Sequence, residues 1–243
     1  RFHKNQKYFN MVKFYITTLM EMVDIIDNEV LPSLLDPIEA AIDNKILLDE
    51  EADAFLEQII NMVDVDDSDI TTSLLTAITS IVRSYIHVIK IPNMINVLNY
   101  LWDNVDETEE DVELPMAIAM LALELYSNAD ESDVDDKLLI ELLGILPLPP
   151  EVCDLEHVIQ SILRIADKNW VRTKQETIIS VSVFMAKVCL MKKKEIEPYD
   201  LSSSAVPDLR KKLKEIVKSD KNIENQIKAE FPRNSSELAA LLK

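Results

Sequence analysis

Apolar residues recur at spacings of three and four along almost the whole chain, which is the pattern of amphipathic helices. Short polar segments such as DVDDSD and DETEED separate these stretches and favour turns. Prolines fall in the first turns of several stretches, where a missing N–H costs little: Pro32, Pro92, Pro115 and Pro207. The pattern predicts helices over residues 7–27, 30–43, 49–64, 69–88, 92–105, 114–128, 133–146, 152–167, 170–191, 206–218, 221–230 and 235–242.

The predicted helices follow one another in pairs with a period near 40 residues. The helix at 69–88 precedes that at 92–105, and the helix at 114–128 precedes that at 133–146. Pairs repeating every ~40–47 residues are typical of HEAT and armadillo repeats. We therefore expect an all-α, HEAT-type α-solenoid of antiparallel helix pairs wound into a right-handed superhelix, with a compact helical bundle as the alternative.

The same pattern predicts one continuous unit over residues 1–243. Helix pairs would occupy 1–197, and the C-terminal capping helices would occupy 198–243. The first residues of this second range, PYDLSSSAVP (198–207), are expected to be an ordered loop or a weak boundary. The first residues, RFHKNQKYFN, contain neither an initiating methionine nor an apolar signal core. We expect the chain to be the C-terminal part of a longer protein.

The amino-acid composition argues against several fold classes and predicts a cellular compartment. A single glycine argues against β-rich folds, Rossmann units and phosphate-binding loops, all of which use glycine at positive φ. No apolar run approaches the ~18 residues that span a membrane. Cys153 and Cys189 lie far apart without a secretory signal, which predicts reduced thiols in the cytoplasm or nucleus.

Charge is divided unevenly along the chain. Residues 21–156 contain 33 acidic and four basic side chains, whereas residues 168–243 contain 16 basic and 10 acidic ones. The acidic part is expected to repel nucleic acids and anionic membranes and to attract basic proteins, although acidity alone also keeps elongated proteins soluble. The run Lys192–Lys194 is expected to complement the negative end of the helix before it rather than to bind RNA.

Polar side chains on one helix and acidic ones in two loops are the candidate binding residues. The helix at 92–105 has an apolar stripe that includes Trp102, and an opposite stripe of asparagine and aspartate. In a HEAT stack the second helix of a pair lines the concave surface, so this polar stripe is expected to contact a partner; a merely solvated face is the alternative. The candidate partner-binding residues are Asp64, Asp66, Asp67, Asp69, Asn96, Asn99, Asp103, Asp106, Glu107, Glu109, Glu110 and Asp111.

Residues for catalysis or metal binding do not cluster in the sequence. The three histidines are widely separated, and His87 is expected to be a partly buried structural residue. Ser202–Ser204 lacks a nearby histidine or an elbow glycine. Residues 130–141 have the length of an EF-hand loop but lack the turn glycine. We expect no enzymatic activity, no cofactor and no metal site.

Four segments carry a family resemblance. Leu142–Leu148 (LLGILPL), continuing as PPEVCDLEHVIQSILRIAD, resembles the C-terminal part of importin-β (karyopherin-β) nuclear transport receptors, nearest the importin-4 and importin-5 branch. The final LRKKLKEIVK and IKAEFPRNSSELAALL are similar to the last helices of that family. DITTSLLTAITSIVRSYIHVIKIPNMINVLNYL is similar to one of its HEAT pairs.

The resemblance implies a receptor that carries basic protein cargo through nuclear pores. It also implies binding to nucleoporin FG repeats, regulation by the GTPase Ran, and shuttling between cytoplasm and nucleus. A HEAT scaffold of another pathway, such as a phosphatase or translation-factor platform, is the alternative.

Overall fold

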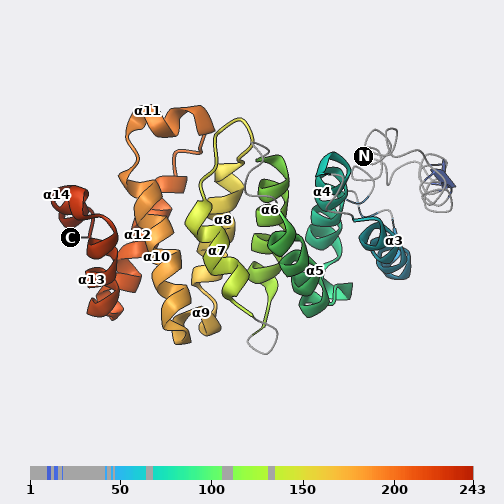
Figure 1. Cartoon of the computed structure of the whole chain (residues 1–243), viewed down its shortest axis with the longest axis horizontal. Helices are drawn as coiled ribbons and strands as arrows, with labels where there is room; N and C mark the ends of the chain where they lie inside the picture. The colour runs from blue at the N-terminus through green and yellow to red at the C-terminus, as the bar shows by residue number, and fades with distance from the viewer. Residues whose placement is uncertain are drawn as a thin grey trace. The chain divides into compact units, whose positions relative to one another are not determined.

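The computed structural model describes residues 10, 11, 14, 15, 18, 42, 45, 47–63, 68–105, 112–130 and 135–242. Within them every regular element is helical, with twelve α-helices, α3 to α14, and three short 3-10 helices (Figure 1). This confirms the predicted all-helical class for these residues. The predicted helices at 7–27 and 30–43 lie almost entirely outside them.

The chain divides into two compact units, Arg1–Leu125 and Tyr126–Lys243. The boundary falls inside helix α6 (Glu113–Asn128). The single superhelix expected from the repeat period stays a prediction.

The first unit contains α3 (Asp49–Met62), α4 (Ser68–Tyr85), α5 (Ile91–Asn104) and most of α6. Helix α3 packs against α4. The buried side of α3 follows helical spacing through Ala52, Phe55, Leu56 and Ile59. Pro92 lies in the first turn of α5, as its position in the sequence predicts.

Tyr85, the last residue of α4, ties this helix to the chain that precedes α3. Its hydroxyl accepts from the Leu47 N–H at 3.1 Å and donates to the Leu47 carbonyl at 3.0 Å. Both residues are buried, at 3% and 6% exposure. The one hydroxyl therefore satisfies a donor and an acceptor that water reaches poorly.

Replacing Tyr85 with phenylalanine should lower the free energy of unfolding by about 1–2 kcal/mol, because both Leu47 backbone groups then lose their partner. The matched control is Tyr100→Phe, since Tyr100 is 61% exposed, and it should change stability by less than roughly 0.5 kcal/mol. Urea unfolding followed by Trp102 fluorescence, in a common Trp170→Phe background, measures both. Equal effects of the two substitutions would contradict this role for the Tyr85 hydroxyl.

The second unit is arranged around α10. Its helices are α7 (Lys137–Ile145), α8 (Leu155–Ala166), α9 (Asn169–Thr173), α10 (Gln175–Leu190), α11 (Lys193–Ile196), α12 (Ala205–Ser219), α13 (Lys221–Glu230) and α14 (Ser235–Leu242) (Figure 1). Helix α10 packs against α7, α8, α9, α12, α13 and α14, and α8 also packs against α12. Val181, Phe184, Met185 and Val188 are fully buried in α10, as its central position requires.

Several helix boundaries differ from the predicted ones. The predicted helix at 170–191 is two helices, because Lys174 adopts an extended conformation between α9 and α10. Helix α8 begins at Leu155, where the Asp154 carboxylate accepts the N–H of His157 at 3.0 Å. Helix α10 ends at Leu190, and Lys192 directly precedes the short helix α11, where its backbone N–H donates to the Glu195 carboxylate at 2.7 Å. The lysine run thus begins a helix and does not form the last turn of α10.

The segment between α11 and α12 is an ordered loop attached to the rest of the second unit. Ser202 donates to the Glu156 carboxylate through its backbone N–H at 3.0 Å and its hydroxyl at 2.9 Å. The Tyr199 hydroxyl donates to the Leu148 carbonyl at 2.8 Å. Burial alone would raise the pKa of Glu156, but the hydrogen bonds from Ser202 outweigh it and lower the pKa.

Candidate partner-binding surface

The polar stripe predicted on α5 is present. Asn96 and Asp103 are exposed and Asn99 is half-buried, while Ile95 and Leu98 on the opposite side are buried. Trp102, which its place in the apolar stripe predicts to be a core residue, is only half-buried.

An exposed tyrosine extends this stripe. Tyr100 is 61% exposed and lies four residues after Asn96 and three before Asp103, so all three share one side of α5. Aromatic side chains that are exposed in a free protein are often the ones that a binding partner covers at the centre of an interface. The spacing of Tyr100 from Asn96 and Asp103 places it on this side of α5. The sequence contains this spacing, but the prediction considered only polar residues and did not include Tyr100.

The stripe leads into a small hollow between α3 and α5. The hollow has a volume of ≈170 Å³ and includes the exposed Asn93 of α5, three residues before Asn96. Its α3 side carries two exposed carboxylates, Asp53 and Glu57, one helical turn apart. Its apolar lining is Leu56, Ile60 and Met94. Asn61 and Lys90 complete the lining, so one cation already lies beside the two carboxylates, which leave the lining net negative. An apolar floor beside this negative charge suits the side chain of lysine or arginine, whose alkyl stem and charged end have different environments.

Of the remaining predicted binding residues, the structure describes only Asp69. Asp69 is exposed in the first turn of α4, where its backbone carbonyl accepts from the Ser73 hydroxyl at 3.0 Å. Eight candidates lie outside the described residues: Asp64, Asp66, Asp67, Asp106, Glu107, Glu109, Glu110 and Asp111. The candidate surface is therefore defined by α3 and α5. We call Asp53, Glu57, Asn93, Asn96, Tyr100 and Asp103 the α3/α5 surface.

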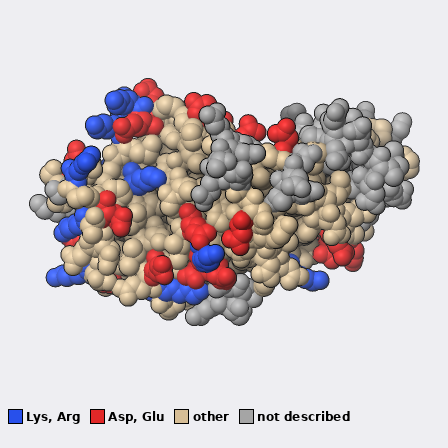
Figure 2. Space-filling model, in the orientation of Figure 1, with Lys and Arg blue, Asp and Glu red and all other residues tan. Residues whose placement is uncertain are grey.

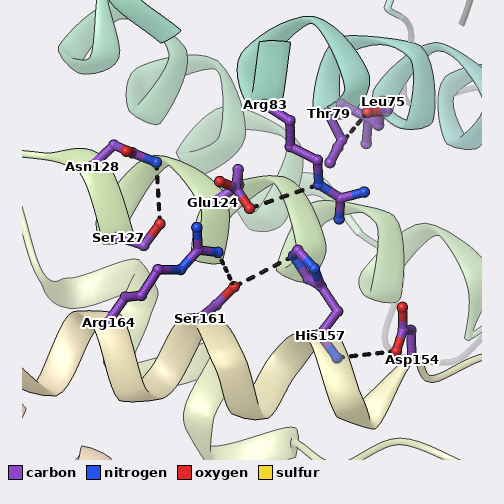
Figure 3. A network of polar contacts seen from close by, with 10 residues as sticks. All are labelled: Leu75, Thr79, Arg83, Glu124, Ser127, Asn128, Asp154, His157, Ser161 and Arg164. Carbon is purple, nitrogen blue, oxygen red and sulfur yellow. Dashed lines mark hydrogen bonds and ion pairs between the residues drawn. The ribbon is translucent and has the colours of Figure 1, made fainter. Parts of the chain in front are cut away.

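One acidic residue of the first unit is not available to a partner. Glu124 of α6 is 4% exposed, and its carboxylate lies 3.7 Å from Arg83 Nε of α4 (Figure 3). A buried carboxylate requires a cation or hydrogen-bond donors to offset its lost hydration. Thr79, one turn before Arg83, donates its hydroxyl to the Leu75 carbonyl at 2.8 Å (Figure 3). Glu124 and Arg83 therefore stabilise the helix packing.

A serine and a histidine approach each other in the second unit. Ser161 Oγ lies 3.4 Å from His157 Nε2 and accepts from Arg164 Nη2 at 2.9 Å (Figure 3). All three residues lie on one side of α8, and Ser161 is fully buried. This geometry explains how the helix satisfies a buried hydroxyl, and it leaves no open space at Ser161 Oγ for a reacting group.

The remaining histidine and cysteine side chains to consider are those of His87, Cys153 and Cys189. His87 is exposed, not partly buried as predicted, and its Nε2 lies 3.0 Å from the Asp49 carboxylate. Burial raises the pKa of Cys153 and of Cys189 to about 11 each, so both are neutral thiols near pH 7. Among the described residues, no group of three His, Cys, Asp or Glu side chains is placed to hold a metal ion.

A search of the described helices for a membrane span finds none that is both long and apolar enough. Comparisons with models of known protein families, with curated proteins and with solved structures find no match for this chain. The importin-β resemblance consequently depends on the sequence segments alone.

Proposed function

We propose that this chain is a helical-repeat module that binds basic protein partners, and that it is the C-terminal region of an importin-β-type nuclear transport receptor. The observation that carries the binding function is the α3/α5 surface, where exposed carboxylates, amides and one tyrosine adjoin an apolar hollow. A basic partner would place a lysine or arginine stem against Leu56 and Met94 and its charge between Asp53 and Glu57.

The helix packing of the second unit supports the repeat architecture. Helices α8 and α10 contact each other, as do α12 and α13, and these are consecutive pairs in the sequence. Between pairs, α8 contacts α12, while α10 contacts both α7 and α13. Contacts between successive pairs thus include first helix with first helix and second helix with second helix, and α10 packs most extensively against α12, the first helix of the next pair. Contacts between successive pairs are those expected of stacked repeats. A right-handed HEAT-type solenoid is the architecture that we propose from this pattern.

Nuclear transport is the more specific part of the proposal. It rests on the resemblance of LLGILPL and the C-terminal helices, and it includes binding to nucleoporin FG repeats, control by Ran and movement between cytoplasm and nucleus. Pull-down of the full-length protein with basic cargo, with and without GTP-loaded Ran, tests it. Loss of cargo with Ran·GTP is expected for an importer, and indifference to Ran would favour the alternative of a scaffold in another pathway.

Neutralising the acids of the α3/α5 surface should weaken binding of a basic peptide. In the variant Asp53→Asn, Glu57→Gln, Asp103→Asn, we expect affinity for a fluorescein-labelled lysine-rich peptide to fall about tenfold, since exposed ion pairs contribute ~0.2–1 kcal/mol each. Stopped-flow association should also slow, and its salt dependence should flatten, because steering by charge acts mainly on the association rate.

The control variant carries the same change in charge elsewhere. Glu151→Gln, Glu197→Gln and Glu230→Gln remove three exposed carboxylates of the second unit. We expect at most a roughly twofold change, because diffuse charge is screened within ~8–10 Å at physiological salt. Equal losses in the two variants would mean that net charge, and not the α3/α5 surface, attracts the basic peptide.

A further inference from the structure

Helix α12 presents a basic side that its own unit does not neutralise. Its apolar side, with Leu209 and Leu213, is fully buried against the unit, and its outer side carries Arg210, Lys211 and Lys214. In Figure 2, lysine and arginine side chains gather over α11 and the C-terminal helices of this unit. This concentration of positive charge contrasts with an overall net charge of −19.

The cations of this side differ in their ion pairs. Lys212, the neighbour of Lys211, is paired with Asp167 at 2.7 Å and with Glu215 at 3.2 Å. Arg210, Lys211 and Lys214 form no ion pair with any carboxylate among residues 47–242 that the structure describes. Three neighbouring cations that form no ion pair attract an anionic partner more strongly than a paired set does.

Two hollows adjoin these cations and share Arg210 and Lys214. One, of ≈400 Å³, lies between α10, α12 and α14 and has the apolar lining Leu190, Ala240 and Leu241. The other, of ≈350 Å³, lies along α12 and includes Val206 and Pro207. The two hollows are adjacent, because Arg210 and Lys214 line both, and we call them together the α12 groove.

Acidic and neutral groups around the groove leave its charge positive. Glu237 of α14 lines the first hollow, and Asn234 Nδ2 donates to its carboxylate at 2.7 Å. Cys189 lies beside Arg210; burial raises the pKa of this thiol to about 11, although Arg210 acts in the opposite direction, so it adds no charge near pH 7. Against one carboxylate, Arg210, Lys211 and Lys214 supply three positive charges.

We propose that the α12 groove binds an acidic peptide that carries apolar anchor residues. Aspartate or glutamate of the peptide would pair with Arg210, Lys211 and Lys214, and a leucine-sized side chain would occupy the hollow beside Ala240. Nucleic acid fits less well, because the residues that line the two hollows include no aromatic side chain on which a base could stack. The inference does not depend on the α3/α5 surface, since it concerns the opposite charge on another unit.

The test uses the whole chain and a fluorescein-labelled peptide of glutamate and aspartate with interspersed leucines. Fluorescence anisotropy should show binding that weakens about tenfold in Arg210→Gln, Lys211→Gln, Lys214→Gln, since three exposed ion pairs are lost. The control Lys193→Gln, Lys221→Gln, Arg233→Gln makes the same change in charge outside the groove, and it should weaken binding by no more than about twofold. Circular dichroism of each variant confirms that the helices are intact.

A second variant separates the groove from diffuse charge. Ala240→Arg fills the apolar hollow while adding positive charge, so it should weaken binding of the leucine-containing peptide, whereas an acidic serine-substituted peptide should bind at least as tightly as it does to the unaltered chain. Four results would overturn the proposal: no binding by the unaltered chain, equal losses in the two triple variants, unchanged or tighter binding of the leucine peptide by Ala240→Arg, or tighter binding of a single-stranded RNA oligonucleotide with the same sensitivity to Arg210, Lys211 and Lys214.

Discussion

Replacing Trp170 with alanine should lower the free energy of unfolding of the second unit by about 3–5 kcal/mol. Trp170 is 2% exposed in α9, and its ring lies 6.2 Å from that of Tyr126, centre to centre, at an angle of 46°. Lys174 Nζ lies 5.8 Å from the ring centre. The substitution removes the apolar contacts, the aromatic pair and the cation contact together, and it leaves a cavity where α9 meets the rest of the unit.

The comparison variant is Trp170→Phe. It keeps an aromatic ring and removes the indole Nε1–H, which is buried without a hydrogen-bond acceptor. We expect a loss near 1 kcal/mol, because the smaller ring leaves a small void while the unsatisfied donor disappears. Urea unfolding monitored by circular dichroism measures both variants, and the fluorescence of Trp102 reports on the first unit. Similar losses for alanine and phenylalanine would contradict the packing role of the indole.

Helix positions were largely predictable from apolar spacing, and the breaks between helices were not. The bounds of α3, α5 and α6 agree with the predicted helices to within two residues because their apolar residues follow a continuous period of three and four. The break at Lys174 carries no proline or glycine. At this break Lys174 Nζ donates to the carboxylate of Asp136, which lies 38 positions earlier in the sequence. The spacing of apolar residues along one helix gives no information about a contact between such distant residues.

The candidate surface was predictable on one helix only. Asn96 and Asp103 were identified because their spacing places them opposite a buried stripe. Asp53 and Glu57 were not predicted as binding residues, because an exposed acidic pair on a helix is common. What distinguishes them is that they line a hollow together with Met94 of α5, and this requires α3 to lie beside α5. Likewise, the α12 groove requires α14 to pack beside α10, which local spacing does not determine.

Replacing Asp136 with alanine should cost the second unit about 2–3 kcal/mol, because hydrogen bonds to a charged group are lost at a partly buried position. Asp136 precedes α7, and its carboxylate accepts from the Thr177 hydroxyl and from Lys174 Nζ, the latter at 3.2 Å. These contacts join the start of α7 to the start of α10. The control Glu176→Gln removes an exposed carboxylate of α10 and should change stability by less than roughly 0.5 kcal/mol.

The contribution of Asp136 should also depend on pH. Burial alone would raise the pKa of this carboxyl, but the hydrogen bonds from Thr177 and Lys174 outweigh burial and hold the pKa below its ordinary value of 3.8. Because the folded pKa is the lower one, the stabilisation is complete above pH ~4 and is lost as the pH falls through the folded pKa. The difference in unfolding free energy between the unaltered chain and Asp136→Asn should therefore be largest near pH 7 and shrink in acid. A difference that stays constant from neutral pH into acid would show that the carboxylate charge does not connect α7 to α10.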